Sequence, residues 1–259
     1  MLPLLRSGRY LFAIALAGFG IEHFIFAHSP MLANVLPYTA NGPVSAWLIG
    51  AGLLIGSLSF ATGTGERLVG WLMGGLLIVD FLVVHAPRMA GALADAGLRT
   101  RGFETLSVAA IGLMLEALST STARARATDI SGRFVPPRSR FDRVTAQVGR
   151  FLFAIALFIF GAQHFTLIPF IASLIPAWMP GHVFLAYFTG AAMVAAALSI
   201  ATGKLIRLAG VLLAVMFLIW VATLHGPRVA HKIRNGDEWC SLLVPVALAG
   251  GGLIVAERF

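Results

Sequence analysis

The sequence predicts an all-α integral membrane protein with eight transmembrane helices, arranged as two parallel-oriented four-helix bundles. Three observations carry this prediction. The 259 residues are 58% hydrophobic and 12% charged, whereas about a quarter of the residues in a soluble domain are charged. The apolar stretches run for about 18 to 22 residues, the length that a membrane-spanning helix requires. The second half of the chain also repeats the pattern of the first.

The continuous apolar stretches favour helices over a transmembrane barrel. In lipid, every backbone polar group must be paired inside the protein, which only helices and closed barrels achieve. A barrel would show alternating hydrophobicity over about ten residues at a time. The net charge of +8 does not predict nucleic-acid binding, because basic residues collect in the cytoplasmic loops of membrane proteins. The predicted partner is therefore the lipid bilayer.

The repeat is visible in short identical motifs. Residues 8–16 read GRYLFAIAL and residues 149–157 read GRFLFAIAL, and each passage continues to a Gly-x-x-His-Phe motif. Later, HAPR at His85 is answered by HGPR at His225. The first passage resembles a signal peptide. Its recurrence in the middle of the chain predicts a retained helix instead.

The helices follow from the apolar runs and from the turn residues between them. The predicted spans are residues 10–27, 44–61, 67–86, 103–119, 149–167, 182–201, 204–225 and 238–257. We expect Pro87 to stop the third span, because the residue before a proline is pushed out of the α region. The chain thus divides into a first four-helix unit (1–119), an Arg-rich cytoplasmic linker (120–148) and a second four-helix unit (149–259).

The distribution of basic residues predicts the orientation. With the N-terminus inside, thirteen of the 19 Lys and Arg residues lie on the inner side and six on the outer side. This bias favours cytoplasmic placement of both termini, in what we expect to be a bacterial inner membrane. Four helices per unit is an even number, so both units point the same way, related by an axis along the membrane normal.

Pairs of small residues four apart predict where helices approach one another closely. Gly52 and Gly56 form such a pair on the second span, and Gly70 and Gly74 form another on the third. Small residues recur at the corresponding places in the second unit.

Four histidines recur near the outer ends of the first and third spans of each unit: His23, His85, His164 and His225. Ionisable groups within membrane segments usually face the protein interior and mark functional sites. We predict that His23 faces His85, and His164 faces His225, within one bundle. Imidazoles there could contact a quinone or a haem as cofactor, or transfer protons. The alternative is that they bridge helices through neutral hydrogen bonds.

Five charged residues are candidates for substrate binding: Arg88, Arg228, Glu104, Glu238 and Asp80. Each arginine follows its histidine by three residues and could bind an anionic group, or could be a snorkelling anchor. The glutamates open the fourth and eighth spans, where the helix dipole favours an acid. A sharper hypothesis pairs Glu104 with Arg88 and Glu238 with Arg228. Asp80 lies within the third span, five residues before its histidine.

Two further residues do not recur and are given no shared role. Glu22 corresponds to Gln163 in the second unit, and the single cysteine, Cys240, is interpreted as an apolar filler. No metal site is predicted, and no catalytic residue can be named, because phosphate-binding loops, nucleophile elbows and His-Glu-x-x-His motifs are absent from the sequence.

The motifs together resemble the DoxX-like family of four-helix bacterial membrane proteins. The resemblance rests on the Gly-Arg start, Gly-x-x-His-Phe, the Pro176 to Pro180 loop with Trp178, and His-x-Pro after the third span. Each unit looks like one family member, so the chain looks like a tandem fusion. The resemblance implies a four-helix fold and, for some members, a membrane subunit of a thiosulfate:quinone oxidoreductase.

Three functional hypotheses follow from these observations. The first is a redox-linked membrane subunit that contacts quinone or haem through the histidines and works with a partner redox subunit. The second is a small-molecule carrier with a polar path between the two units. The third is a non-enzymatic assembly factor of a membrane complex, bound through the Arg-rich linker. The sequence leaves all three open.

Overall fold

A computed structural model describes residues 7–28, 43–92, 94–130 and 140–259, with the side chains of 116–130 excepted. The described part of the chain is helical and contains no strand. Its helices are, in chain order, α2 (Gly8–Ile25), α4 (Pro43–Thr62), α5 (Glu66–Asp80), η2 (Phe81–His85), α6 (Ala86–Gly91), α7 (Ala96–Ile130), α8 (Arg140–Thr166), α9 (Ile168–Leu174), α10 (His182–Thr202), α11 (Ile206–Trp220), η3 (Val221–His225), α12 (Gly226–His231) and α13 (Gly236–Arg258).

The protein is an integral membrane protein with several spans. Among the described residues, six helices are long and apolar enough to cross a bilayer: α4, α5 with its extension to Gly91, α8, α10, α11 with its extension to His231, and α13. The first and fourth predicted spans form helices α2 and α7 but are not among the six. In α2, the polar residues Arg9, Glu22 and His23 lower the mean hydropathy of the helix. In α7, the side chains are described only as far as Leu115.

Two helices reach beyond their predicted ends into the segment expected to be a linker. Helix α7 runs to Ile130 and α8 starts at Arg140, so most of residues 120–148 is helical. Of the six linker arginines, the structure describes the side chains of Arg140 and Arg143, at the start of α8. The other linker arginines fall outside the described side chains.

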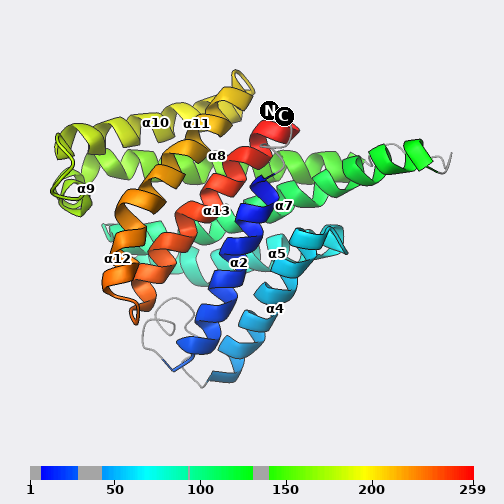
Figure 1. Cartoon of the computed structure of the whole chain (residues 1–259), viewed down its shortest axis with the longest axis horizontal. Coiled ribbons are helices and arrows are strands. Elements are labelled where there is room, and N and C mark those ends of the chain that lie inside the picture. Colours follow the sequence, from blue (N-terminus) through cyan, green and yellow to red (C-terminus); the bar gives the residue numbers. More distant parts are fainter. Residues whose placement is uncertain (1–6, 29–42, 93, 131–139) are drawn as a thin grey trace.

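The helices pack as a closed ring rather than as one bundle for each half of the chain (Figure 1). Helix α2 packs along α4 and α13, and α7 packs along α5 and α8, while α10 lies along α8 and α11 along α13. Each packed group of four therefore takes two helices from each half. In Figure 1 one group, with α2 and α13, runs steeply, and the other, with α7 and α8, runs across it.

Glycines explain why helices from different halves pack so closely. A Cβ atom on Gly8 would lie 2.8 Å from the carbonyl oxygen of Gly250, and one on Gly250 would lie 2.7 Å from that of Gly8. Gly149 approaches the carbonyl of Ala110 in the same way, at 2.7 Å. Only residues without a side chain permit such approach between helix backbones. The first and last helices are thereby held together.

The core lies along α13 and the middle of α7. Residues 243–256 of α13 are buried without exception, and residues 106–115 of α7 are buried as well. Large side chains that fill the space between them include Phe12, Phe153 and Ile111, each of which is fully buried. The other helices bury one side and expose apolar side chains on the other, as expected of helices that face lipid.

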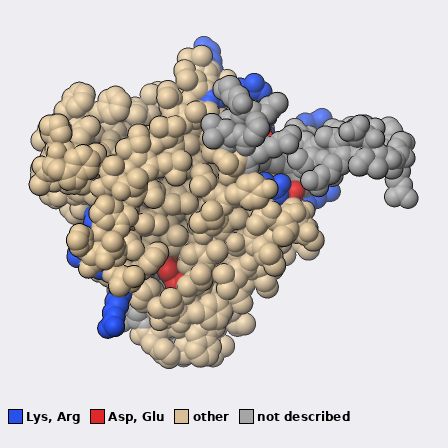
Figure 2. Space-filling view, in the orientation of Figure 1, with Lys and Arg blue, Asp and Glu red and all other residues tan. Residues whose placement is uncertain are grey.

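The surface agrees with this arrangement. In Figure 2, a broad area without Lys or Arg separates two groups of these residues, one toward the upper right and one at the lower left. The first group surrounds the turns after α4 and α10 and the start of α8, and is called the linker end below. The second surrounds α6 and α12 and is called the histidine end.

The third span does not end at Pro87 as predicted. It continues through one π-helical turn, η2, into α6, and the same happens at Pro227 through η3 into α12. In each case the backbone N–H of the residue before the proline reaches back five residues, from Ala86 to Phe81 and from Gly226 to Val221. A proline ring collides with the carbonyl four residues earlier in a regular α-helix. The wider π turn relieves this collision, so the helix continues.

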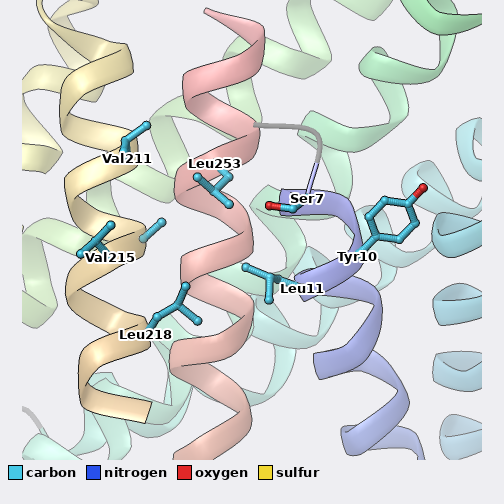
Figure 3. Close-up of a pocket in the computed structure, with 8 residues that line it drawn as sticks. Ser7, Tyr10, Leu11, Val211, Val215, Leu218 and Leu253 are labelled. Carbon is cyan, nitrogen blue, oxygen red and sulfur yellow. The ribbon is translucent and has the colours of Figure 1, made fainter. Parts of the chain in front are cut away.

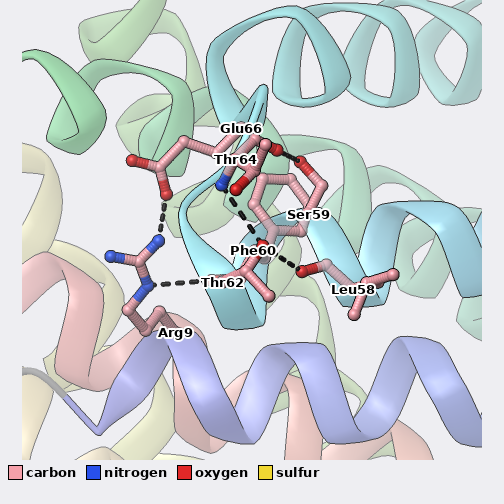
Figure 4. Close-up of polar contacts among 7 residues, drawn as sticks. All are labelled: Arg9, Leu58, Ser59, Phe60, Thr62, Thr64 and Glu66. Atoms are coloured by element: carbon pink, nitrogen blue, oxygen red, sulfur yellow. Dashed lines mark hydrogen bonds and ion pairs between the residues drawn. The ribbon is translucent and has the colours of Figure 1, made fainter.

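At the linker end, a network of polar contacts joins the first three helices (Figure 4). The guanidinium of Arg9 on α2 donates to the backbone carbonyl of Phe60 at 2.9 Å and also to the carboxylate of Glu66, which is buried. Ser59 donates to the carbonyl of Thr64 at 2.6 Å and closes the turn. Arg67 forms an ion pair of 2.8 Å with the buried Asp142 of α8. These contacts fix the register of the helices.

Candidate functional site

His23 and His164 occupy equivalent places at helix crossings. The Nδ1 atom of His23 lies 2.7 Å from the carbonyl oxygen of Phe19, one turn earlier in α2, and His164 makes the same contact with Phe160 at 2.8 Å. Each imidazole sits where its helix passes close to the next one. A Cβ on Gly50 of α4 would lie 2.9 Å from the Cβ of His23. His23 Nε2 is buried and has no hydrogen-bond partner among the described residues.

His85 lies at a different helix interface from His23. It is 3% exposed, and its Nε2 atom lies 3.3 Å from the carboxylate of Asp80 and 3.3 Å from the hydroxyl of Thr105 on α7. A π turn stacks residues five apart, so η2 brings Asp80 under His85. In a regular α-helix the two would point in different directions. This pair was not predicted, because the amino-acid sequence contains no recognisable signal for a π turn.

His225 lacks both of these partners. Trp220 occupies the position of Asp80 in the second half. Pro245 stands at the position equivalent to Thr105. This equivalence follows from Gly112 and Gly252, which approach the equivalent glycines of α5 and α11, Gly70 and Gly210. His225 Nδ1 is buried without a hydrogen-bond partner in the described part of the chain. His85 and His225 therefore have different surroundings, although the two positions are equivalent in the repeat.

The second half instead contains an ion-pair cluster at the same end. Arg228 on α12 donates to Glu238 on α13 at 2.8 Å, and Lys232 donates to the same carboxylate at 3.2 Å. Glu238 is 5% exposed. The predicted pairing of Arg228 with Glu238 is thus present. Leu98 stands at the position equivalent to Glu238 in the first half, so this acid does not recur there.

Glu104 does not pair with Arg88. It lies nearer to the middle of its helix than Glu238 does, and the charged group that acts on it is Arg101, one turn earlier. Glu104 and Glu238 are therefore not equivalent residues, contrary to the prediction. Glu238 lies in the first turn of α13, as predicted, but α7 begins at Ala96, so Glu104 does not open its helix.

Glu104 belongs to a group of residues that the sequence did not place together. Cys240 on α13 lies within electrostatic range of Glu22 on α2, of Glu104 and Arg101 on α7, and of Asp237 one turn earlier. We call these five residues the acidic cluster. Asp237 and Arg101 are exposed, Glu104 and Cys240 are partly buried, and Glu22 is buried. The three helices that contribute come from both halves of the chain.

Glu22 is the most unusual member of the acidic cluster. Its side chain is buried, with the whole residue 6% exposed, and its Oε1 atom has no hydrogen-bond partner among the described residues. Transfer of a carboxylate out of water without a compensating partner is costly. Such groups within membrane segments are uncommon and mark ion or proton pathways.

The two halves differ at this place in an informative way. Gln163 occupies the position of Glu22, and it exchanges hydrogen bonds with α7: Thr100 donates to its side-chain oxygen at 3.0 Å, and its amide donates to the carbonyl of Ala96 at 3.3 Å. Thr100 is in turn equivalent to Cys240. A satisfied Gln–Thr pair in one half thus corresponds, in the other, to a Glu whose Oε1 atom lacks a partner among the described residues and which lies within electrostatic range of a thiol.

Sequence reasoning set Glu22 and Cys240 aside because they do not recur. That criterion selects what the two halves share, whereas here the polar group that lacks a partner lies where the halves differ. A signal was nevertheless present, because an acid within an apolar span is costly whether or not it recurs.

Within the described ranges, no group of three or more His, Cys, Asp or Glu side chains is arranged so that it could hold a metal ion. No protein-family model, curated protein or solved structure matches this chain.

Proposed function

We propose that this protein is a proton-linked membrane carrier, in which Glu22 takes up and releases a proton as a small solute moves. The observation that carries the proposal is the buried Oε1 atom of Glu22, which lacks a hydrogen-bond partner in the described part of the chain. A carboxyl group in this setting is stable when protonated and costly when ionised. Each loss of its proton must therefore be accompanied by a change in its surroundings.

The position of the acidic cluster supports this function over the other hypotheses. A carrier needs a polar path between the two halves, and Glu22, Glu104 and Cys240 come from helices of both halves. Two members of the cluster, Asp237 and Arg101, are exposed to the surroundings of the protein. Asp80, which the carrier hypothesis first invoked, is engaged by His85 at a separate interface.

The proposal includes the finer features predicted from the sequence. We propose eight spans, with α2 and α7 added to the six apolar helices, and a cytoplasmic linker end in a bacterial inner membrane. The excess of basic residues at that end supports this orientation. We also propose that the chain is a tandem of DoxX-like units, on the motifs given above.

The test is proton movement in proteoliposomes that contain a pH-sensitive dye. Small amines, amino acids and carboxylic acids are applied one at a time to the wild-type protein, and we expect at least one to move protons. Glu22→Gln should abolish this movement, because an amide occupies the same space but does not titrate. Asp95→Asn is the matched control: Asp95 is an exposed acid at the same end, and it accepts a hydrogen bond from the Leu98 amide that an asparagine can also accept.

Two results would contradict the proposal. One is a Glu22→Gln protein that moves protons as the wild type does. The other is a wild-type protein that moves no protons with any solute and whose infrared difference spectrum shows no protonated carboxyl band that is lost in Glu22→Gln.

A second candidate function is supported by a different observation. His23 Nε2 and His225 Nδ1 are buried and have no partners among the described residues, which fits a hydrogen bond between a single imidazole and a ligand. Because Nδ1 of His23 donates to the carbonyl of Phe19, the Nε2 atom of the neutral ring accepts, for example from the hydroxyl of a quinol. A haem held between His23 and His85 does not fit, because the two residues lie at different helix interfaces. Extraction of bound quinone from wild type, and its loss in His23→Ala and His225→Ala, would favour this redox-linked function.

A further inference from the structure

An apolar groove runs along the lipid-facing side of the protein between α2 and α11, with α13 as its floor (Figure 3). Val211, Val215 and Leu218 form one wall, Ser7 and Leu11 lie on the other, and Leu253 lies between them. The cavity has a volume of about 240 Å³. In a bilayer such a space is filled by lipid, because side chains around an empty one would forfeit their dispersion contacts.

The equivalent place in the other half of the molecule is closed. Trp71 on α5 occupies the position of Val211, since each residue directly follows a shared glycine, Gly70 or Gly210. The ring of Trp71 packs on that of Phe141 with their centroids 4.1 Å apart. Phe141 belongs to the part of α8 that precedes Gly149. The open groove is therefore a feature that one half has and the other lacks, not a general consequence of the repeat.

A basic side chain, that of Arg207, lies at the linker end of the open groove. Arg207 precedes Val211 by one helical turn, and Val215 follows by one more, so the three side chains lie on one stripe of α11. Arg207 is exposed. Lys204, also exposed, lies on the turn immediately before the helix. Guanidinium groups bind phosphate strongly, often through two parallel hydrogen bonds, and basic residues between membrane helices recognise anionic head groups.

We propose that this groove is a binding site for one anionic phospholipid. Its phosphate lies at Arg207 at the linker end, and an acyl chain extends along Val211, Val215 and Leu218 over α13. This site is separate from the acidic cluster, which lies at the histidine end, and the inference does not depend on the proposed carrier function.

The acyl-chain part is tested by Val211→Trp, which introduces the residue that closes the equivalent groove. The control is Leu212→Trp, the next residue along, which is 58% exposed and does not line the cavity. Each protein is purified with dioleoyl phosphatidylglycerol, and the bound lipid is counted by native mass spectrometry. We expect Val211→Trp to lose most of the tightly bound lipid and Leu212→Trp to retain it. Equal retention in both, with both proteins folded, would overturn the site.

The head-group part is tested by Arg207→Gln in competition between dioleoyl phosphatidylglycerol and dioleoyl phosphatidylcholine. Removing one cation should reduce the preference for the anionic lipid about fivefold while leaving the groove able to hold an acyl chain. Arg234→Gln, which removes an exposed arginine at the opposite end, should leave the preference unchanged. Added inorganic phosphate should not displace the lipid. Displacement by phosphate, or an unchanged preference in Arg207→Gln, would refute the assignment of an anionic lipid.

Discussion

Single glycines decide how closely the helices of this protein approach one another. The sequence predicted that Gly52 would contact a neighbouring helix, but in the described part of the chain no atom of another helix lies within 4 Å of the place where its Cβ would stand. The close approach occurs at Gly50, where a Cβ would lie 2.8 Å from the carbonyl oxygen of Gly20. The prediction for Gly74 was correct, since a Cβ there would meet Leu113 at 2.5 Å.

The physical reason for the error is that helix faces in lipid are not distinguished by polarity. In a soluble protein, the polar face of a helix shows which residues are turned away from the core. Here α4 is apolar on all sides, so two glycines a short distance apart look alike in the sequence although they face opposite environments. Glycine pairs alone therefore cannot define the contact face of a membrane helix.

This difference gives a paired prediction. Gly50→Ala should destabilise the protein by about 1–3 kcal/mol, because the added methyl group is forced against backbone and against the Cβ of His23. Gly52→Ala should change stability by less than about 0.5 kcal/mol, as is usual for exposed sites. Unfolding in increasing SDS from a mild detergent measures both. Equal destabilisation by the two substitutions would show that the α2–α4 interface is placed incorrectly.

Among the elements, the two π turns were the features that the sequence could not predict. The positions of the long helices were predicted well, because an apolar run of sufficient length determines a span. Pro87 was expected to end its helix, as prolines often do. A single π turn accommodates the ring instead, and in doing so it places Asp80 beneath His85. Asp80 and His85 were both recognised as candidates, but not as a pair.

If the π turn exists to accommodate proline, its extra residue and the proline should be energetically coupled. Deleting Val83 from η2 removes the extra residue and forces a regular α-helix into Pro87. We expect this deletion to cost about 3 kcal/mol in the presence of Pro87, and much less in the Pro87→Ala background. A double-mutant cycle on the SDS unfolding midpoint measures the coupling. Independent, additive effects would mean that the π turn has another cause.

At the scale of the whole molecule, the exchange of helices between halves was not foreseen. The repeat predicted two similar units, and equivalent elements do recur, down to the π turns. The sequence contains no information about whether α2 packs on α7 of its own half or on α13 of the other, because the two apolar interfaces are chemically alike. The mutual approach of Gly8 and Gly250 decides this choice, and it is visible only in three dimensions.

The ring predicts how the two halves behave as separate chains. Residues 1–130 and 140–259 produced together should assemble and co-purify through a tag on either one, because α2–α13 and α7–α8 contacts join them. Either half alone should be degraded or aggregate, since two of its helices lack partners. Gly250→Leu should abolish co-purification, with Gly52→Leu as control. A stable, monodisperse four-helix protein from residues 1–130 alone would contradict the ring.

The closed ring also has a consequence for how such a protein can evolve. A four-helix ancestor packed in this way would bury its first and last helices only by pairing with an identical copy. In that homodimer every substitution would appear twice, so two acids or two amides would stand on either side of the α7–α13 contact. Fusion into one gene releases this constraint. One copy can then keep a satisfied Gln163 as scaffold while the other acquires Glu22, a reactive group that a symmetric ancestor could not hold singly.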